Sequence, residues 1–180
     1  IEGDNRYHSI FGGSVEGGCY AVHPSDTAPS LIALDASIQT TRRTIKAVDF
    51  FAVGVSRTTV LEWDEIVTEI ILPKNESNVK STFMKFATRS SIDFPIVNCA
   101  AMLEPSNGRV KNARICLNAV FVKPYRALDA EKVIHGKAMD ETLAELAGEA
   151  AVSKAKPMKF NRYMVSIAKS LVSRSIQACG

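Results

Sequence analysis

The chain has 180 residues, 46% of them hydrophobic and 23% charged, and its 22 basic and 19 acidic side chains leave a net charge of +3. This composition excludes a chain that is disordered throughout and allows one domain or a small pair of domains. The basic residues are interspersed with acidic ones, so we expect no nucleic-acid binding, and no apolar run approaches the ~20 residues of a membrane span. Charged side chains within residues 1–20 argue against a secretory signal, so we expect a cytoplasmic protein.

The first part of the chain predicts a loop, a short helix and a hairpin. Residues 1–18 are rich in glycine and favour a connecting loop. Residues 25–34 offer capping side chains, then a proline near a first turn and apolar residues at helical spacing, which predict a short helix. Residues 37–41 and 43–47 alternate as two hairpin strands do. Residues 54–57 resemble a linker, so we place a domain boundary between 54 and 55.

The second part predicts strands followed by helices. The β-rich runs are 66–73, 81–88, 96–103 and 110–122, and residues 105–108 (PSNG) have the composition of a hairpin turn. From Tyr125 onward the apolar period changes to about 3.6, which predicts helices at 128–134 (ended by Gly136), 139–154 and 160–178. This order is typical of the α+β class. We expect an antiparallel meander of three or four strands with the C-terminal helices on one face.

The residue types alone give no self-contained catalytic set. The three histidines, His8, His23 and His135, lack partners at metal-ligand or triad spacing, and we expect structural or surface roles for them. The four cysteines include no CxxC pair, so we expect reduced thiols and no metal site. The glycine pairs at 12–13 and 17–18 do not stand between a strand and a helix, as a phosphate-binding loop would.

Two local features could carry binding. The first is Asp26, at the start of the expected helix, where it could simply cap the helix. The second is Lys85, on an expected strand, together with Arg89 and Asp93 in the loop after it. Lys85 could simply face water on an alternating strand. The residue types do not decide between these ordinary roles and a ligand site.

A resemblance to a known protein family favours a ligand site over these ordinary roles. Residues 5–12 (NRYHSIFG) and 19–31 (CYAVHPSDTAPSL) look like the second FAD subdomain of the flavoproteins of the xanthine dehydrogenase and carbon monoxide dehydrogenase family. Residues 61–73 (LEWDEIVTEIILP), followed by 81–97, are similar to the sequence that opens their C-terminal domain. The resemblance implies an incomplete FAD-binding subdomain at 1–54, and a domain similar to the carbon monoxide dehydrogenase flavoprotein C-terminal domain at 55–180.

This resemblance implies an oxidoreductase subunit of a molybdenum hydroxylase, most simply of the xanthine dehydrogenase type. Its FAD would pass electrons from iron-sulfur clusters to NAD or another acceptor, and its partners would be an iron-sulfur subunit and a molybdopterin subunit. A second hypothesis is a non-redox assembly module that docks those two subunits, since residues 97–180 show no convergence of polar groups. An unrelated α+β protein that matches by chance is the third.

The resemblance also implies site residues. Asp26 would accept a hydrogen bond from the ribityl or adenosine side of the flavin. Ile66 and Val67 would present backbone atoms and an apolar surface to the cofactor. Lys85 matches a flavin-contacting lysine that offsets the charge of a diphosphate or a reduced ring. Asp93 would border the isoalloxazine, where its charge could tune reduction or the access of NAD.

Two further expectations follow from the resemblance. One branch of the family uses a cysteine at the position of Cys19 in an extra iron-sulfur cluster, but its other ligands are absent here, and a cluster needs four. We therefore expect a free Cys19. Relatives bind the FAD diphosphate with glycine-rich loops that would lie upstream of residue 1. Because backbone N–H groups of such loops hold the phosphates, we expect the 180-residue chain alone to purify without flavin.

Overall fold

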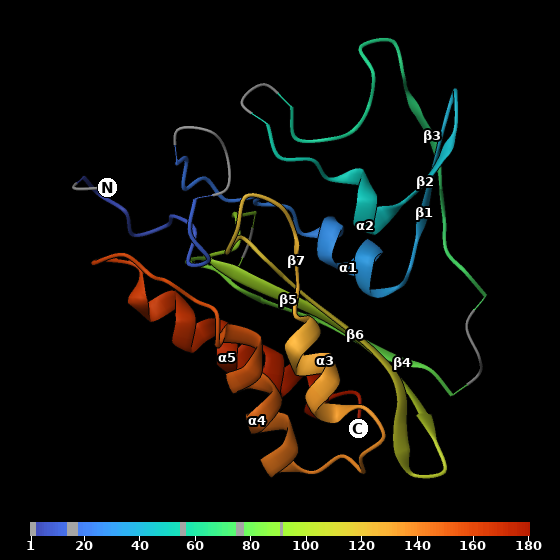
Figure 1. The fold of residues 1–180 in the computed structure, drawn as a ribbon, viewed down its shortest axis with the longest axis vertical. Coiled ribbons are helices and arrows are strands. Elements are labelled where there is room, and N and C mark those ends of the chain that lie inside the picture. Colours follow the sequence, from blue (N-terminus) through green and yellow to red (C-terminus); the bar gives the residue numbers. More distant parts are fainter. Residues whose placement is uncertain (1–2, 14–17, 55–56, 75–77, 91) are drawn as a thin grey trace.

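A computed structural model describes residues 3–13, 18–54, 57–74, 78–90 and 92–180 (Figure 1). In chain order its elements are α1 (Thr27–Ala33), β1 (Ser37–Thr40), β2 (Thr44–Lys46), α2 (Ala47–Phe50), β3 (Val67–Ile71), β4 (Lys80–Phe86), β5 (Val97–Ser106), β6 (Arg109–Asn118), β7 (Tyr125–Arg126), α3 (Leu128–Ile134), α4 (Glu141–Val152) and α5 (Arg162–Gln177). The strands form a three-stranded sheet and a four-stranded sheet. The α+β class is therefore confirmed.

The four-stranded sheet is the expected meander. Its strands lie in the order β4-β5-β6-β7, and each pairs antiparallel with the next. The turn between β5 and β6 has Asn107 and Gly108 at φ values of 51° and 72°. Two consecutive positive φ values are those of a two-residue type I′ hairpin, which Asn-Gly adopts at little cost. The predicted hairpin is therefore confirmed.

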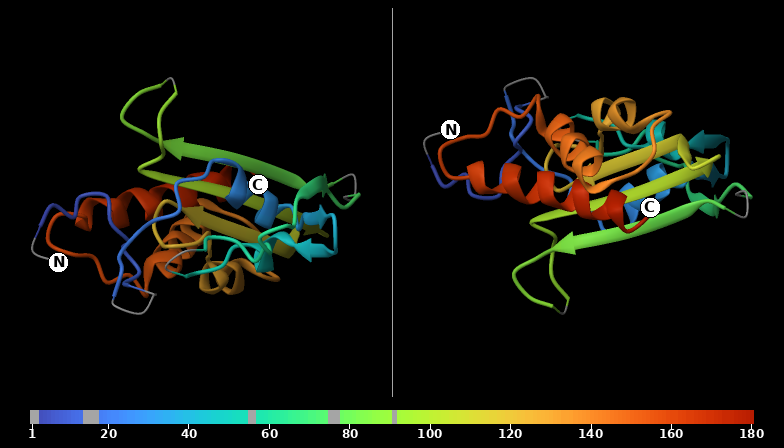
Figure 2. Two further views of the ribbon diagram at one scale, coloured as in Figure 1. Left: turned by 90° about the horizontal axis from the view of Figure 1, so that it is seen from above. Right: turned by 90° about the horizontal axis from the view of Figure 1, so that it is seen from below.

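Both faces of this sheet are covered. On one face Cys99, Ala101 and Leu103 of β5 share a core with residues of α3, α4 and α5. On the opposite face Ala100 and Met102 lie against α1. Figure 2 shows α1 on one side of the sheet and α5 on the other. The expectation of helices on one face was therefore incomplete, and double coverage explains why β5 is buried along most of its length.

The three-stranded sheet has the order β2-β1-β3, so β3 is an edge strand. β3 pairs antiparallel with β1, which extends this sheet to Ile71, beyond the boundary predicted at 54–55. All five residues of β3 are exposed, including Ile70 at 53%. Directly opposite, Ile38 of β1 is 3% exposed. The core of this region therefore lies under β1 and does not extend to β3.

A buried carboxylate closes the hairpin of this sheet onto the segment before β3. The side chain of Glu65 accepts hydrogen bonds from Arg43 Nε and Nη2, each at 3.0 Å, and from Thr40 Oγ1 at 2.6 Å. The Arg43 guanidinium, and after it the Thr40 hydroxyl, lower the pKa of Glu65 to about 2. Glu65 is therefore ionised in the folded protein at neutral pH.

The N-terminal segment is fastened to the C-terminal helices. The side-chain amide of Asn161, just before α5, donates to the carbonyls of His8 and Ser9 at 2.8 and 3.2 Å. Asn5 Oδ1 accepts from the backbone N–H of Phe160 at 3.0 Å, and Ile10 is fully buried in the main core. The segment predicted as a connecting loop is thus an ordered strap over described residues 3–13.

The helices begin and end close to the predicted positions. α3 is followed by Gly136 in the left-handed region, and α4 begins where Asp140 Oδ1 accepts from the N–H of Leu143 at 2.7 Å. α2 and β7 were not predicted. Over the described residues, no helix is both long and apolar enough to cross a bilayer.

Candidate functional site

Three polar side chains form a row across the four-stranded sheet. Lys85 of β4 is the register partner of Asn98 of β5, which is the register partner of Asn118 of β6. Asn98 and Asn118 are fully buried, and the Lys85 side chain is 24% exposed. Asn98 shares its face with Ala100 and Met102, because residues two apart on a strand point the same way. The row therefore lies on the face of the sheet that α1 covers.

The segment that leads into α1 crosses this row. Lys85 Nζ donates to Asp26 Oδ2 at 2.6 Å, and Asn98 Nδ2 donates to Asp26 Oδ1 at 2.9 Å. The backbone carbonyl of Ser25 accepts from the amides of both asparagines, at 3.0 Å from Asn98 and 2.7 Å from Asn118. The structure thus brings together two predicted residues, Asp26 and Lys85, that stand 59 positions apart.

The carboxylate of Asp26 does not cap α1. Asp26 occupies the N-cap position, but its side chain accepts no capping hydrogen bond. The hydroxyl of Ser25 accepts from the N–H of Ala28 at 3.1 Å instead. The ordinary interpretation of Asp26 as a cap is therefore wrong, because both of its oxygens are directed at the sheet. An ion pair as exposed as this one, 24% at Lys85 and 48% at Asp26, contributes only about 0–1 kcal/mol to stability.

The loop after β4 completes the surroundings of Lys85. Its ammonium donates a second hydrogen bond, of 2.6 Å, to the backbone carbonyl of Asp93. The carboxylate of Asp93 holds the loop itself, since it accepts from Arg89 Nε at 3.3 Å and from the N–H of Phe94 at 2.9 Å. The hydrogen bond from Arg89 lowers the pKa of Asp93. Asp93 therefore meets Lys85 through its backbone, and its charge is paired with Arg89.

A hollow of about 360 Å³ lies beside this cluster. It is lined by Tyr7, Val22, Pro24, Thr88, Asp93, Phe94, Pro95, Ile96 and Ala119. Most of these side chains are apolar, and Pro24 and Asp93 connect the hollow to the ion pair. An apolar hollow beside a few convergent polar groups is the usual form of a small-molecule site.

The two other predicted residues lie at the start of β3, the edge strand of the other sheet. Val67 opens β3, and Ile66 precedes it, whereas Lys85 and the asparagines belong to the four-stranded sheet. Both residues are exposed, Ile66 at 67% and Val67 at 37%. Their apolar side chains are exposed, and they are not part of the polar row.

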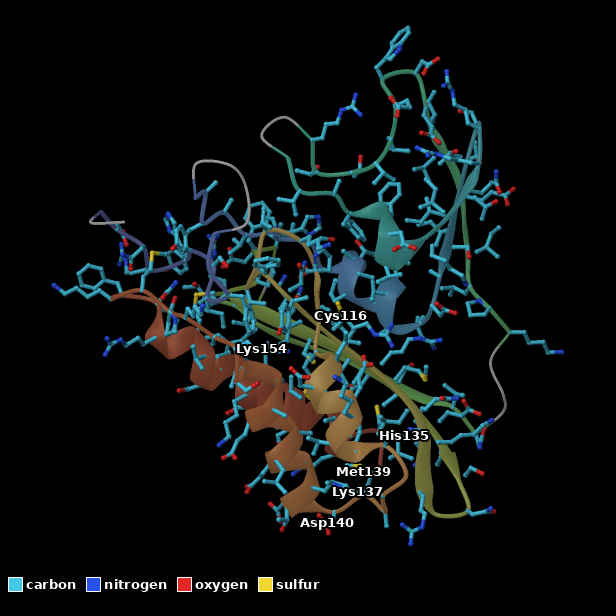
Figure 3. The ribbon with its side chains drawn as sticks, viewed as in Figure 1. Cys116, His135, Lys137, Met139, Asp140 and Lys154 are labelled. Carbon is cyan, nitrogen blue, oxygen red and sulfur yellow. The ribbon has the colours of Figure 1, made fainter. Side chains whose placement is uncertain are left out.

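Of the histidines and Cys19, only His23 lies beside the polar row in the described residues. His23 is half-buried, contacts the ring of Phe51 edge-on, and lies 3.3 Å through Nδ1 from the amide of Asn118. Burial lowers the pKa of His23, and the neutral ring can accept that N–H. His8 is exposed, and so is His135, which follows α3 in the region of Lys137 and Met139 (Figure 3). Cys19 is exposed and free.

Comparison with known proteins places the whole arrangement in a family. Residues 5–75 match the family model of the FAD binding domain in molybdopterin dehydrogenase. Residues 82–179, more than half of the chain, match that of the CO dehydrogenase flavoprotein C-terminal domain. The chain belongs to the FAD-binding subunits of the molybdenum hydroxylases. The resemblance proposed from the sequence is therefore confirmed.

Individual members of this flavoprotein family are similar along most of the chain. The nicotine 6-hydroxylase medium subunit of Paenarthrobacter nicotinovorans is 30% identical, over 83% of this chain and 54% of that protein. The aldehyde oxidoreductase FAD-binding subunit PaoB of Escherichia coli is 29% identical, over 93% and 54%. A structure of carbon monoxide dehydrogenase from Hydrogenophaga pseudoflava superposes with a TM-score of 0.78 at 27% identity, over 87% and 56%. The chain spans about half the length of these relatives.

Sequence reasoning missed two residues of the candidate site, Asn98 and Asn118. A signal was present, because each asparagine interrupts an otherwise apolar run, in VNCAAML and ICLNAVF. Polar residues within buried strands are uncommon and need partners. What the sequence could not supply was the register that sets both residues beside Lys85.

Proposed function

We propose that Asp26 and Lys85 form one wall of the flavin site in the electron-transferring subunit of a molybdenum hydroxylase. The observation that supports this most directly is the 2.6 Å ion pair between them, which joins the segment before α1 to the four-stranded sheet. It stands beside an apolar hollow in a chain whose family binds FAD. The charge pair and the hollow together suit a cofactor that has a flat ring system, hydroxyls and a diphosphate.

Each residue would contact a different part of the cofactor, according to its chemistry. The ammonium of Lys85 would offset negative charge on a phosphate or on the reduced ring. The exposed part of the Asp26 carboxylate would accept a hydrogen bond from a hydroxyl, and the apolar lining of the hollow would exclude water. Ile66 and Val67 would add apolar surface from the start of β3. Asp93 would hold the loop after β4 in place through its hydrogen bond from Arg89. The bound FAD would itself supply the electron transfer.

We further propose the partners and the acceptor. An iron-sulfur subunit would supply electrons that a molybdopterin subunit takes from the substrate, and NAD or another acceptor would receive them. The xanthine dehydrogenase type rests on the sequence resemblance. The substrate of the enzyme would be chosen in the molybdopterin subunit, outside this chain.

Substitution of Lys85 in the full-length subunit tests the proposal. Lys85→Ala should weaken FAD binding about tenfold to a hundredfold, because a hydrogen bond from a charged group contributes about 1.5–3 kcal/mol. Bound flavin per subunit and the dissociation constant of FAD measure this effect. Lys80→Ala is the matched control, since Lys80 lies on the same strand but donates to the carbonyl of Gly180.

The same experiment separates this function from the assembly hypothesis. Asp26→Ala should weaken FAD binding in the same direction as Lys85→Ala, while association with the partner subunits persists. If both variants keep a full complement of flavin and lose their partners instead, the assembly module is the better description. Equal effects of Lys80→Ala and Lys85→Ala would also refute the site.

A further inference from the structure

In the described part of the chain, the side chains of Asn98 and Asn118 form hydrogen bonds through their nitrogens only. Within the described residues, Asn98 Oδ1 and Asn118 Oδ1 are enclosed and have no hydrogen-bond partner. An enclosed oxygen without a partner lowers stability, so folded proteins contain few of them. Because each oxygen is shut off from solvent, there is no room beside it for a ligand. The role of Asn98 and Asn118 must therefore come from their side-chain nitrogens.

Both amides share one acceptor, and each has a second polar neighbour, Asp26 Oδ1 at 2.9 Å for Asn98 and His23 Nδ1 at 3.3 Å for Asn118. Each Nδ2 donates to the backbone carbonyl of Ser25, at 3.0 Å from Asn98 and 2.7 Å from Asn118. Turning either amide over would place its oxygen against that carbonyl oxygen, and two acceptors repel each other. Asn98 would also set its oxygen against the carboxylate of Asp26. Both side-chain nitrogens thus face residues 25 and 26, and this orientation leaves both side-chain oxygens without a partner.

A third buried asparagine shows how the residue behaves in a purely structural place. Asn161 donates through Nδ2 to the carbonyls of His8 and Ser9, and its Oδ1 accepts from the N–H of Met158 at 2.6 Å. Both ends of that amide are satisfied. Asn98 and Asn118 are equally buried but leave one end unsatisfied, which is the pattern expected where function sets a requirement on the structure.

We propose that Asn98 and Asn118 are positioning residues that hold the Ser25 carbonyl and thereby fix the Asp26 carboxylate against Lys85. This inference rests on the proposed flavin site and extends it to two residues that touch no cofactor. Asn98 acts directly, through its bond to Asp26 Oδ1, and Asn118 acts one residue away, through Ser25. Asn98 therefore has the larger effect. The row of three side chains works as one unit, because register places them side by side.

The first test needs no flavin. In the ¹⁵N-labelled chain, solvent exchange of the Lys85 ammonium hydrogens reports how firmly Asp26 is held. Asn98→Leu, which has a similar shape but no donor, should speed this exchange severalfold, and Asn118→Leu should speed it less. Should Asn98→Leu fail to fold, Asn98→Ala removes the same donor and gives the same test. Unchanged exchange in folded variants of both positions would overturn the inference.

Two control variants separate positioning from a general loss of stability. Asn112→Leu removes an exposed asparagine of β6 that donates to Glu104, and should leave the Lys85 exchange unchanged. Ile134→Val loosens the core on the opposite face of the sheet, and should lower stability without changing that exchange. If Ile134→Val speeds the exchange as much as Asn98→Leu does, the asparagines only contribute to stability and the inference is wrong.

The second test uses the full-length subunit with FAD. Asn98→Leu should weaken FAD binding about tenfold and shift the flavin reduction potential, whereas Asn112→Leu should change neither. A wild-type subunit that holds no FAD would refute the proposed function, and the exchange measurement would still decide the positioning role. A wild-type subunit that holds FAD, with an unchanged dissociation constant and potential in Asn98→Leu, would refute this inference alone.

Discussion

The two sheets of this chain differ in how completely their side chains are packed. The four-stranded sheet has side chains packed on both faces, and its central strand β5 is buried from Val97 to Leu103. The three-stranded sheet ends in β3, whose residues are all exposed. The ion pair stands where the segment before α1 meets the better-packed sheet. The four-stranded sheet thus supplies the floor of the site, and the segment before α1, which packs on that sheet, supplies the carboxylate.

This difference explains why the polar row can tolerate unsatisfied atoms. Register pairing fixes Lys85, Asn98 and Asn118 on three adjacent strands, and the apolar residues around them exclude water. A sheet with a large core can offset the cost of two unpartnered oxygens. The exposed strand β3 lacks such a core. Among the described residues, it carries no cluster of buried polar side chains.

The largest change in stability is expected from a substitution that creates a cavity in the core of the four-stranded sheet. Leu117 of β6 is fully buried in the main core, so Leu117→Ala should lower the free energy of unfolding by about 2–5 kcal/mol. Leu146→Ala is the control, because Leu146 on α4 is 49% exposed, and it should change stability by less than about 0.5 kcal/mol. Denaturant unfolding measures both. Equal losses would mean that the sheet is not the centre of stability.

An intermediate effect is expected from Glu65, through pH. Its pKa in the folded chain is about 2, below the usual value of 4.5. Its contribution is therefore complete above about pH 4.5 and is lost as the pH falls toward 2. The denaturant midpoint should decrease across this range, and Glu65→Gln should flatten the decrease. Glu69→Gln, at an exposed position of β3, should leave the pH profile as it is. Identical profiles for all three proteins would contradict the role of Arg43 and Thr40.

The smallest effect is expected on β3 itself. Ile70→Ser should change the free energy of unfolding by about 0.5 kcal/mol or less, because its side chain is already half in water. Ile38→Ser, at the register partner on β1, should cost far more, since Ile38 is buried. Unfolding of the two variants under the same conditions sharpens the contrast within one sheet. Similar losses would show that β3 is covered in solution.

Local patterns predicted much of the fold. The Asn107-Gly108 turn, the end of α3 before Gly136 and the meander all depend on residues close in sequence. The pairing of β3 with β1 and the placement of α1 on the second face depend on contacts between distant segments. No periodicity reports such contacts. β7 and α2 are too short, at two and four residues, for a repeating pattern to reveal.

The candidate site divides in the same way. Asp26 and Lys85 could be proposed from the family resemblance, and the structure places them in contact. The side chains of Asn98 and Asn118 gain their role only from register, which brings them within reach of Ser25. A sequence shows that an asparagine interrupts an apolar strand. It does not show which carbonyl the amide reaches.

The strap formed by the N-terminal segment has a consequence for synthesis of the chain. Asn161 bonds to the carbonyl of His8 across 153 positions, and Ile10 belongs to the same core as the last helix. At a translation rate of about 5–20 residues per second, roughly ten to thirty seconds separate the appearance of these two partners. During that interval the core around Ile10 lacks the residues that α5 contributes. The packing of residues 3–13 can therefore be completed only after α5 has left the ribosome.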